Sequence, residues 1–394
     1  MNMKSNNTFI YFTILFFSVL FLFVGSWIVS SDAYESEHMD NIGYYAGVVT
    51  QIIDRIEHDF GFFDGNSTTE IIFEVRITDR SERRGELVIA EQQITDFFIV
   101  NEREVSAGDR ITLFYAEWND VFHFAGYQRV NYIAILGILF IACVILFGRK
   151  KGFNAIIALG FTCLAIFLIF IPAILSGMNI YVITMIICIY SIVTTLLIVI
   201  GVNKKALSAM LGCLGGVILA GSLMFIMDAV LRLTGALDRD TEVLLLLENP
   251  IDLRAIVFAG VILGAVGAIM DVAMSIASSL WEVREVGGAS DFKSILKSGI
   301  NIGKDILGTM LNTLILAYIG SSLSLILLIT ANAISFAALF NMELIIVELL
   351  RALIGSFGML LTIPLTAVIC GWLYTLRQDD DAMDEYDEYF GPRT

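Results

Sequence analysis

Charged residues are scarce in this sequence: Asp, Glu, Lys and Arg make up 16% of its 394 residues, against about 25% in soluble domains. Proline occurs 4 times, histidine 3 times and cysteine 5 times, whereas hydrophobic residues account for 57%. So little charge argues against a soluble globular enzyme, a nucleic-acid-binding protein and a disordered chain. The composition predicts a polytopic α-helical membrane protein.

The five cysteines all lie in apolar runs, and the polar N-terminal part of the chain has none. Their spacing contains no CxxC or other metal-ligating pattern, so they are most simply buried small residues. We therefore expect no disulfide framework, no metal and no cofactor.

The net charge of −16 is concentrated in two segments. Residues 32–131 hold 20 acidic and 8 basic residues, and residues 379–394 hold 7 acidic and 1 basic. The remaining chain is nearly neutral. This distribution predicts an acidic N-terminal polar domain and an acidic tail, 377–394, that is solvated and disordered.

Runs of roughly 20 mostly apolar residues are long enough to cross a bilayer. Pro172 and the Ser176-Gly177 pair divide one uncharged run into two helices. The sequence thereby predicts about eight transmembrane helices, one at 9–29 and seven in a domain at 132–376, namely 132–148, two within 152–203, 206–227, 255–281, 306–330 and 352–376. The first run lacks a small-residue cleavage site, which favours a retained helix over a signal peptide. Residues 335–350 are expected to form an interfacial or re-entrant helix.

Lys and Arg favour cytoplasmic loops in membrane proteins. If the N-terminus is inside, the loops that hold Lys151, Lys205 and Lys293 all fall on the cytoplasmic side. We therefore expect both termini in the cytoplasm and residues 32–131 outside it.

The segment 32–131 has the alternating pattern of β-strands. Phe73, Val75 and Ile77 alternate with polar residues, and a turn at 107–109 precedes another alternating stretch. Five such stretches predict a small extracytoplasmic all-β domain, an OB-like barrel, with a five-stranded sandwich as the alternative. Asp54 and His58 are four residues apart and are either a cation site or, more simply, part of a solvated acidic segment.

Seven residues of the predicted sixth span share one helical face, because their spacing is 4, 3, 4, 4, 3 and 4. We expect the three glycines to form a helix-packing surface. Asp271 lies near mid-span, where a carboxylate costs roughly 2.5–3.5 kcal/mol on insertion scales, and is therefore a candidate functional group. A packing face with a neutralised carboxylate is the alternative. The seven residues are Gly260, Gly264, Gly267, Asp271, Ser275, Ser278 and Glu282.

A second polar face occurs at and before the predicted seventh span. Asn301, Asp305 and Asn312 lie on it, and Asn312 is the expected hydrogen-bond partner of Asp271. Three further pairs are expected to be structural: Asp228 with Arg232, Glu348 with Arg351, and the small-residue surface of Gly212 and Gly216.

Three motifs follow one another along the second half of the chain: GAVGAIMDVA at 264–273, continuing to Ala277-Ser278 and Trp281-Glu282; NTLILAYIG at 312–320; and GSFG at 355–358 with PLT at 364–366. In this order they resemble the YibE/F family of bacterial membrane proteins. The family often has two acidic residues where this chain has Met270-Asp271, and a His where it has Asp305-Ile306. The resemblance implies a multi-pass protein of the bacterial plasma membrane and brings no established activity.

Two functions from different classes fit these observations. A transporter for an ion or small solute would bind a cation or proton at Asp271, with Ser275, Asn301 and Asn312 lining the path. A non-enzymatic assembly or envelope-interaction protein would instead use its β domain. Protease, hydrolase and ATP-binding signatures are absent from the sequence, so we do not expect an enzyme. The expected partners are the lipid bilayer, a small ion or solute, and a second copy or related membrane subunit, without nucleic acid.

Overall fold

The computed structural model describes residues 2–30, 42–59, 67–79, 81–95, 103–116, 121–237, 239–246, 250–287, 291–331 and 336–390. The chain divides into two compact units, and each is described by itself. One unit comprises Glu35–Cys143, and the other comprises Met1–Tyr34 together with Val144–Thr394.

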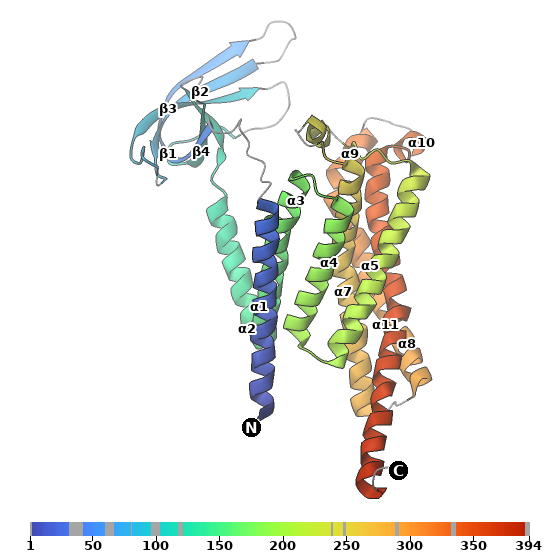
Figure 1. Ribbon diagram of the computed structural model, residues 1–394. Coiled ribbons are helices and arrows are strands. Elements are labelled where there is room, and N and C mark those ends of the chain that lie inside the picture. The colour runs from blue at the N-terminus through green and yellow to red at the C-terminus, as the bar shows by residue number, and fades with distance from the viewer. Residues whose placement is uncertain are drawn as a thin grey trace. The chain divides into compact units, whose positions relative to one another are not determined.

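The smaller unit contains a closed five-stranded barrel (Figure 1). Neighbouring strands are antiparallel except β3 and β5, which pair in parallel. Strand β1 pairs with both β2 and β4, and two register shifts along it provide the bend that closure requires. The order around the barrel is β1 (Ile42–Asp59), β2 (Ser67–Ile77), β3 (Leu87–Thr95), β5 (Val121–Tyr127) and β4 (Arg110–Ala116).

The interior of this barrel follows the alternation in the sequence. Phe73, Val75, Ile111 and Leu113 are buried, whereas their neighbours along the strands point outward. The predicted small barrel is thereby confirmed, and closure excludes the open sandwich. At the predicted turn, Gly108 has a φ of +94° and its N–H donates to the Val49 carbonyl. That backbone conformation favours glycine.

The predicted pair of Asp54 and His58 is described only in part. Asp54 is exposed, and the side chain of His58 lies outside the described residues. Within the described part of the chain, no group of three or more His, Cys, Asp or Glu residues is arranged to hold a metal ion.

The larger unit is a helix bundle. Figure 1 shows its long helices side by side. Its elements are α1 (Asn2–Ser30), the C-terminal part of α2 (Val130–Ala165), a π-helical turn η1 (Ile166–Phe170), α3 (Ile171–Leu175), α4 (Ile180–Ile200), α5 (Lys204–Leu231), α6 (Arg239–Val243), a 3-10 turn (Leu244–Leu246), α7 (Leu253–Gly287), α8 (Phe292–Ser321), α9 (Leu323–Ala331), α10 (Phe336–Leu339) and α11 (Glu343–Phe390).

Seven helices in the described chain are long and apolar enough to cross a membrane, where the sequence predicted about eight segments. One of the seven, Val130–Leu175, has 46 residues and contains a non-helical residue, Arg149. The break accounts for the difference, because it separates the two stretches that the sequence predicted as individual spans. Just beyond it, a Cβ at Gly152 would overlap the carbonyl oxygen of Val144, so the tight bend requires glycine there.

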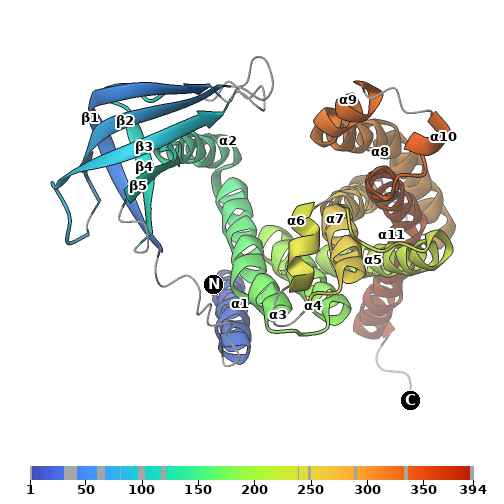
Figure 2. The same cartoon turned by 90° about the horizontal axis from the view of Figure 1, so that it is seen from above.

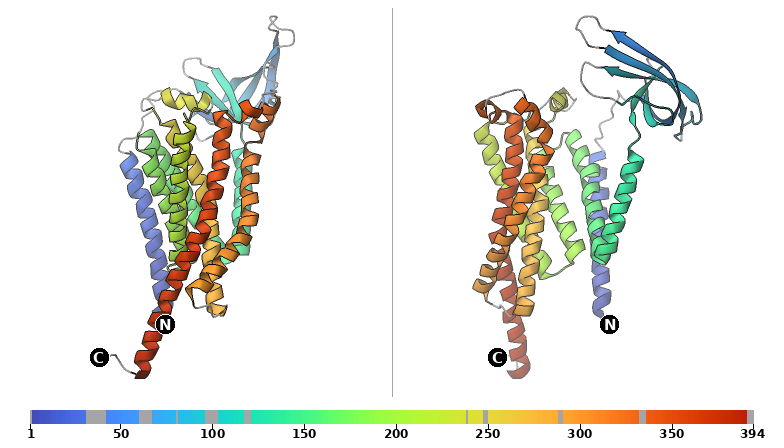
Figure 3. Two further views of the ribbon diagram at one scale, coloured as in Figure 1. Left: turned by 90° about the vertical axis from the view of Figure 1, so that its right-hand side faces the viewer. Right: turned by 180° about the vertical axis from the view of Figure 1, so that it is seen from behind.

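Four predicted segments differ from the helices of the structure. The region 282–305 was expected to be a loop, but α7 continues to Gly287 and α8 begins at Phe292. The predicted seventh span, 306–330, is divided between α8 and α9. The predicted re-entrant segment and the predicted disordered tail both contribute to α11, which is helical from Glu343 to Phe390 (Figure 3).

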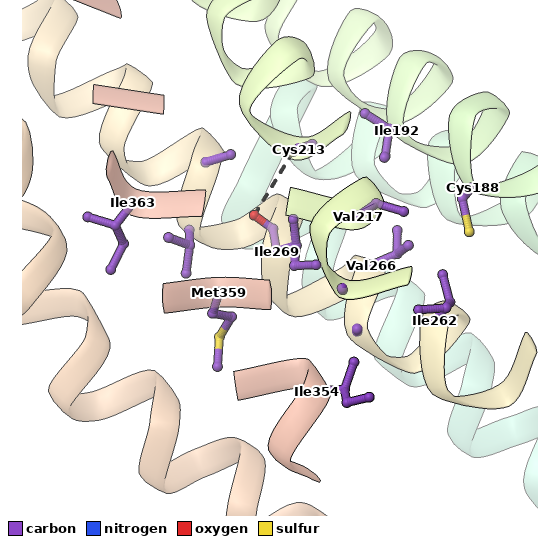
Figure 4. Packing of buried hydrophobic residues seen from close by; sticks show 14 of the residues in the cluster. Cys188, Ile192, Cys213, Val217, Ile262, Val266, Ile269, Ile354, Met359 and Ile363 are labelled. Atoms are coloured by element: carbon purple, nitrogen blue, oxygen red, sulfur yellow. Dashed lines mark hydrogen bonds between the residues drawn. The ribbon is translucent and has the colours of Figure 1, made fainter. Parts of the chain in front are cut away.

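Two groups of buried residues hold the bundle together. The main core combines α4, α5, α7, α8 and α11, with Ile192, Val217, Ile269 and Met359 among its members (Figure 4). The second core combines α1, the C-terminal part of α2, η1, α3, α4 and α7, and includes Ile187. Helices α4 and α7 contribute to both cores and therefore join the two groups.

Helices α5 and α11 pack closely together at two glycines of α5. A Cβ at Gly216 would overlap the Thr362 hydroxyl oxygen, and a Cβ at Gly212 would overlap that of Thr366. Both glycines and both threonines are buried. The small-residue surface predicted at Gly212 and Gly216 is thus a helix contact in which larger side chains do not fit.

Candidate functional site

Helix α7 packs against α4, α5, α8 and α11 (Figure 2). It buries Ile262, Ile269 and Ile276 in the main core. The predicted polar face points away from that core. Gly260, Gly264, Gly267, Asp271 and Glu282 are exposed on it, and Ser275 and Ser278 are half-buried.

Asp271 lines a cavity of about 390 Å³ between α2, α4 and α7. It is the only Asp, Glu, Lys or Arg in the lining, which otherwise consists of apolar side chains with a few small polar groups. Ser191 of α4 donates a hydrogen bond to Thr162 of α2 across part of this lining. Among the described residues, no hydrogen bond or ion pair involves the Asp271 carboxylate. We refer to this space as the Asp271 cavity.

A larger cavity of about 640 Å³ follows along α7 toward its C-terminal end. Its lining is more polar, and Ser275, Ser278, Lys151 and Lys205 belong to it. Val199 and Met274 line both cavities, so these two side chains stand between them. We refer to this second space as the lysine cavity.

The Asp271 cavity lies where the two cores of the bundle meet. Ile187 in its lining belongs to the second core, whereas Cys188 and Val266 belong to the main core. A carboxylate at a junction between two packed groups of helices is positioned where relative movement of those groups would change access to it.

The residues expected from the second polar face do not join this site. Asn301, Asp305 and Asn312 are exposed on α8, and neither cavity is lined by α8. No hydrogen bond between Asp271 and Asn312 occurs. Helical periodicity groups each set on one face, but it does not determine which neighbouring helix that face meets.

None of the three α7 glycines of the polar face lies against another helix backbone, and only two of them have a side chain nearby. A Cβ at Gly264 would lie 3.2 Å from the Tyr318 hydroxyl, one at Gly260 would lie 3.8 Å from Arg351, and one at Gly267 would have no neighbour within 4 Å. Arg351 forms the expected pair with Glu348, at 2.6 Å between Nη1 and Oε1.

The ion pair expected between Asp228 and Arg232 was wrong. Asp228 accepts instead from Arg254, with distances of 2.5 Å from Nη2 and 3.4 Å from Nε. Arg232 ends α5 in a left-handed conformation with a φ of 54°. The bidentate pair therefore joins α5 to α7 rather than stabilising one turn of α5.

One of the polar pairs in the barrel that the sequence did not reveal joins β5 to β3. His123 Nδ1 of β5 lies 2.7 Å from Glu91 Oε1 of β3, and the His123 ring stacks on Phe114. Partial burial, together with the neighbouring Glu70 carboxylate, raises the pKa of Glu91 in spite of the opposing effect of His123. The two residues are 32 positions apart, and only the parallel β3–β5 pairing makes them neighbours.

The bundle of long apolar helices identifies the chain as a membrane protein. Residues 136–376 match the family model described as YibE/F-like protein. This match covers more than half of the chain, which therefore belongs to the YibE/F family. It includes every residue of both cavities but neither α1 nor the barrel strands. No curated protein and no solved structure is similar enough to match.

Proposed function

We propose that this protein transports an ion or small solute and that Asp271 binds a cation or proton during transport. The observation that supports the proposal best concerns the Asp271 carboxylate on the apolar helix α7. It lines a cavity and has no hydrogen-bond or ion-pair partner among the described residues. An intramembrane carboxylate is costly unless a proton, a cation or water compensates it. The cavity offers space for such a compensating group.

The arrangement of the bundle supports a route along α7. The Asp271 cavity and the lysine cavity share Val199 and Met274, so passage between them needs displacement of these two side chains. Met is unbranched and adapts readily to new surroundings. Movement of the second-core helices relative to the main core would shift Val199 and Met274. Such a shift would open and close the connection between Asp271 and the lysine cavity.

The orientation predicted from the sequence completes the proposal. We infer that both termini face the cytoplasm of a bacterium and that the barrel lies outside the plasma membrane. Green fluorescent protein fused after Thr394 should then fluoresce, because it folds in the cytoplasm. Alkaline phosphatase fused directly after Tyr127 should be active, because it requires an oxidising compartment. Reversed activities would contradict the orientation.

The transport proposal is tested by ion flux in proteoliposomes. We expect proton uptake, followed with trapped pyranine, or ²²Na⁺ uptake, to be lost in Asp271→Asn. Asp305→Asn is the matched control, because Asp305 is an exposed carboxylate on α8 outside both cavities. Equal flux through wild type and Asp271→Asn, at equal reconstituted amounts, would contradict the role of Asp271.

A second candidate is an envelope-interaction role for the barrel. Leu87 and Ile89 on the outward side of β3 are 52% and 62% exposed, and exposed apolar side chains on a small domain are candidates for partner contact. If the barrel binds the cell wall, co-sedimentation with purified peptidoglycan should be lost in Leu87→Ser/Ile89→Ser and retained in Asp271→Asn. Retention in both variants would remove this candidate.

A further inference from the structure

The lysine cavity is lined by two lysines that do not line the Asp271 cavity and have no role in the proposed transport. Lys151 lies near the start of the larger unit's part of α2, and Lys205 lies in the first turn of α5. The lining contains no Asp or Glu. Neither ammonium group takes part in an ion pair with another described residue. Two lysines thus line one space of about 640 Å³, and Glu282, which interacts electrostatically with Lys205, lies outside the lining.

Hydroxyl groups cover the opposite wall of this cavity. Ser275, Ser278 and Ser279 of α7 all belong to the lining. Within the part of the chain that the structure describes, none of their hydroxyls forms a hydrogen bond. Ser208 and Ser222 show the usual alternative in a helix, because each donates to the carbonyl four residues earlier.

The N-terminus of α5 adds to the positive potential. Asn203, which also lines the cavity, caps this helix by accepting from the Ala206 N–H at 2.7 Å. The N–H groups of the first helical residues precede any intrahelical acceptor, and the helix dipole is positive at this end. On the α7 side, Arg284 lies 5.8 Å from the ring centre of Trp281, another lining residue. Glu282 is exposed and does not line the cavity.

We propose that the lysine cavity is a binding site for a phosphate or carboxylate group, held by Lys151 and Lys205 and hydrogen-bonded by the hydroxyls of Ser275 and Ser278. Lysine is a common ligand of phosphate, and charge-assisted hydrogen bonds to such anions are stronger than neutral ones. The volume falls within the range of about 300–1,000 Å³ typical of small-molecule sites. The inference does not rest on the proposed transport activity, because anion binding is a property at equilibrium.

The anion has two possible sources, a soluble solute or the headgroup of an anionic lipid. The experiment uses purified full-length protein in nanodiscs of phosphatidylcholine, which has no net charge. Binding of ³²P-labelled inorganic phosphate is measured by scintillation proximity, with citrate as the competing carboxylate. In parallel, native mass spectrometry of protein purified from a phosphatidylglycerol-containing membrane records whether one anionic lipid stays bound.

The key variant is Lys151→Gln/Lys205→Gln, and the matched control is Lys150→Gln/Lys204→Gln. Lys150 and Lys204 are the adjacent lysines, but they do not line the cavity. Both doubles remove two positive charges from the same ends of the same helices. A Ser278→Ala variant tests the hydroxyl wall without changing the charge.

We expect saturable phosphate binding that is weakened about tenfold or more in Lys151→Gln/Lys205→Gln and changes by less than about twofold in the control. Ser278→Ala should weaken it by a smaller factor. If phosphate does not bind but a retained phosphatidylglycerol is lost only from the key variant, the same site takes a lipid headgroup. Absence of both kinds of binding, or equal loss in the control double, would overturn the proposal. Asp271→Asn should retain anion binding, so failure of the transport proposal and failure of this one are distinguishable.

Discussion

The contact between α5 and α11 predicts a large effect from a very small substitution, Gly216→Ala. The new Cβ would overlap the Thr362 hydroxyl oxygen and would lie 3.0 Å from Cγ2 of Ile269. Thr362 is fully buried, and its hydroxyl donates to the Gly358 carbonyl at 2.7 Å. Rotation of Thr362 would break this buried hydrogen bond, so the substitution costs either that bond or a separation of the two helices.

Two opposing magnitudes decide the sign of this effect. Replacing Gly by Ala inside a helix favours folding by about 1 kcal/mol, whereas overpacking a dense core costs about 1–3 kcal/mol or somewhat more. Because one overlap and one tight contact arise together at a fully buried position, we take the upper part of that range. We therefore expect Gly216→Ala to lower the free energy of unfolding by about 2 kcal/mol.

The measurement is reversible unfolding in mixed micelles, followed by circular dichroism during an SDS titration. Gly267→Ala is the matched control, because a Cβ there has no neighbour within 4 Å; it should be neutral or slightly stabilising. Thr362→Ala should rescue Gly216→Ala, since the nearest remaining Thr362 side-chain atom is its Cβ at 3.2 Å. If Gly216→Ala and Gly267→Ala are equally stable, or if the pair of substitutions is simply additive, the close approach of α5 and α11 is refuted.

Two further predictions concern polar contacts. Glu343 accepts hydrogen bonds from the Thr234 and Gly235 N–H groups, both at 2.6 Å, and from the Thr234 hydroxyl at 2.8 Å. Glu343→Ala should therefore accelerate hydrogen exchange of the loop after α5 by about tenfold or more. An unchanged exchange rate would show that these bonds do not hold the loop. For Glu91, the raised pKa in the folded barrel means that its contribution to stability is present below the ordinary value of 4.5 and is lost as the pH rises through the folded value. Glu91→Gln should accordingly increase the protection of β3 from hydrogen exchange relative to wild type at pH 7, and this difference should shrink toward pH 4.5. Lower protection than wild type at pH 7 would show that ionised Glu91 stabilises the barrel, contrary to this reasoning.

The strands of the barrel were predictable because each one carries its own signal. Alternation at Phe73, Val75 and Ile77 places three side chains in the interior whatever the neighbouring strand is. The closing pairs β1–β4 and β3–β5 join segments far apart in the chain, and no local pattern specifies them. The contact between Glu91 and His123 depends on such a pair and was missed for that reason.

Helix boundaries failed where charge was taken as the end of a helix. The start of α8 contains Lys293, Lys297 and Lys304, which suggested a loop. Its buried positions, Ile295, Gly299 and Gly303, nevertheless repeat every four residues and pack on α11 and its neighbours. That repeat was a readable signal of one continuous helix, because lysines are tolerated on the side opposite a buried stripe.

Lys151 and Lys205 show a different limit. In the sequence they serve only to orient the chain, because positive residues gather at cytoplasmic helix ends. Their common position on one cavity wall depends on how α2 and α5 pack near α7. Lys151 and Lys205 are more than 50 positions apart in the sequence, and Lys205 is more than 50 positions from the serines of α7. Sequence reasoning could assign their charge but had no means of assigning them to a site.

Asp271 combines what the sequence predicts well with what it does not. Periodicity placed it on a polar face, and Asn312 on the next long helix was the expected partner, yet the carboxylate lines a cavity with α2 and α4 instead. A hydrogen bond from Asn312 would have offset part of the cost of placing the charge there. A structural role alone would then have explained why the carboxylate is present. Without that bond, we infer that the same cost of roughly 2.5–3.5 kcal/mol is met by a proton, a cation or water in the cavity. The absence of the expected partner therefore strengthens the proposal that Asp271 binds and releases a proton or cation. A bound proton or cation can leave, whereas a hydrogen bond from Asn312 would be a fixed part of the fold.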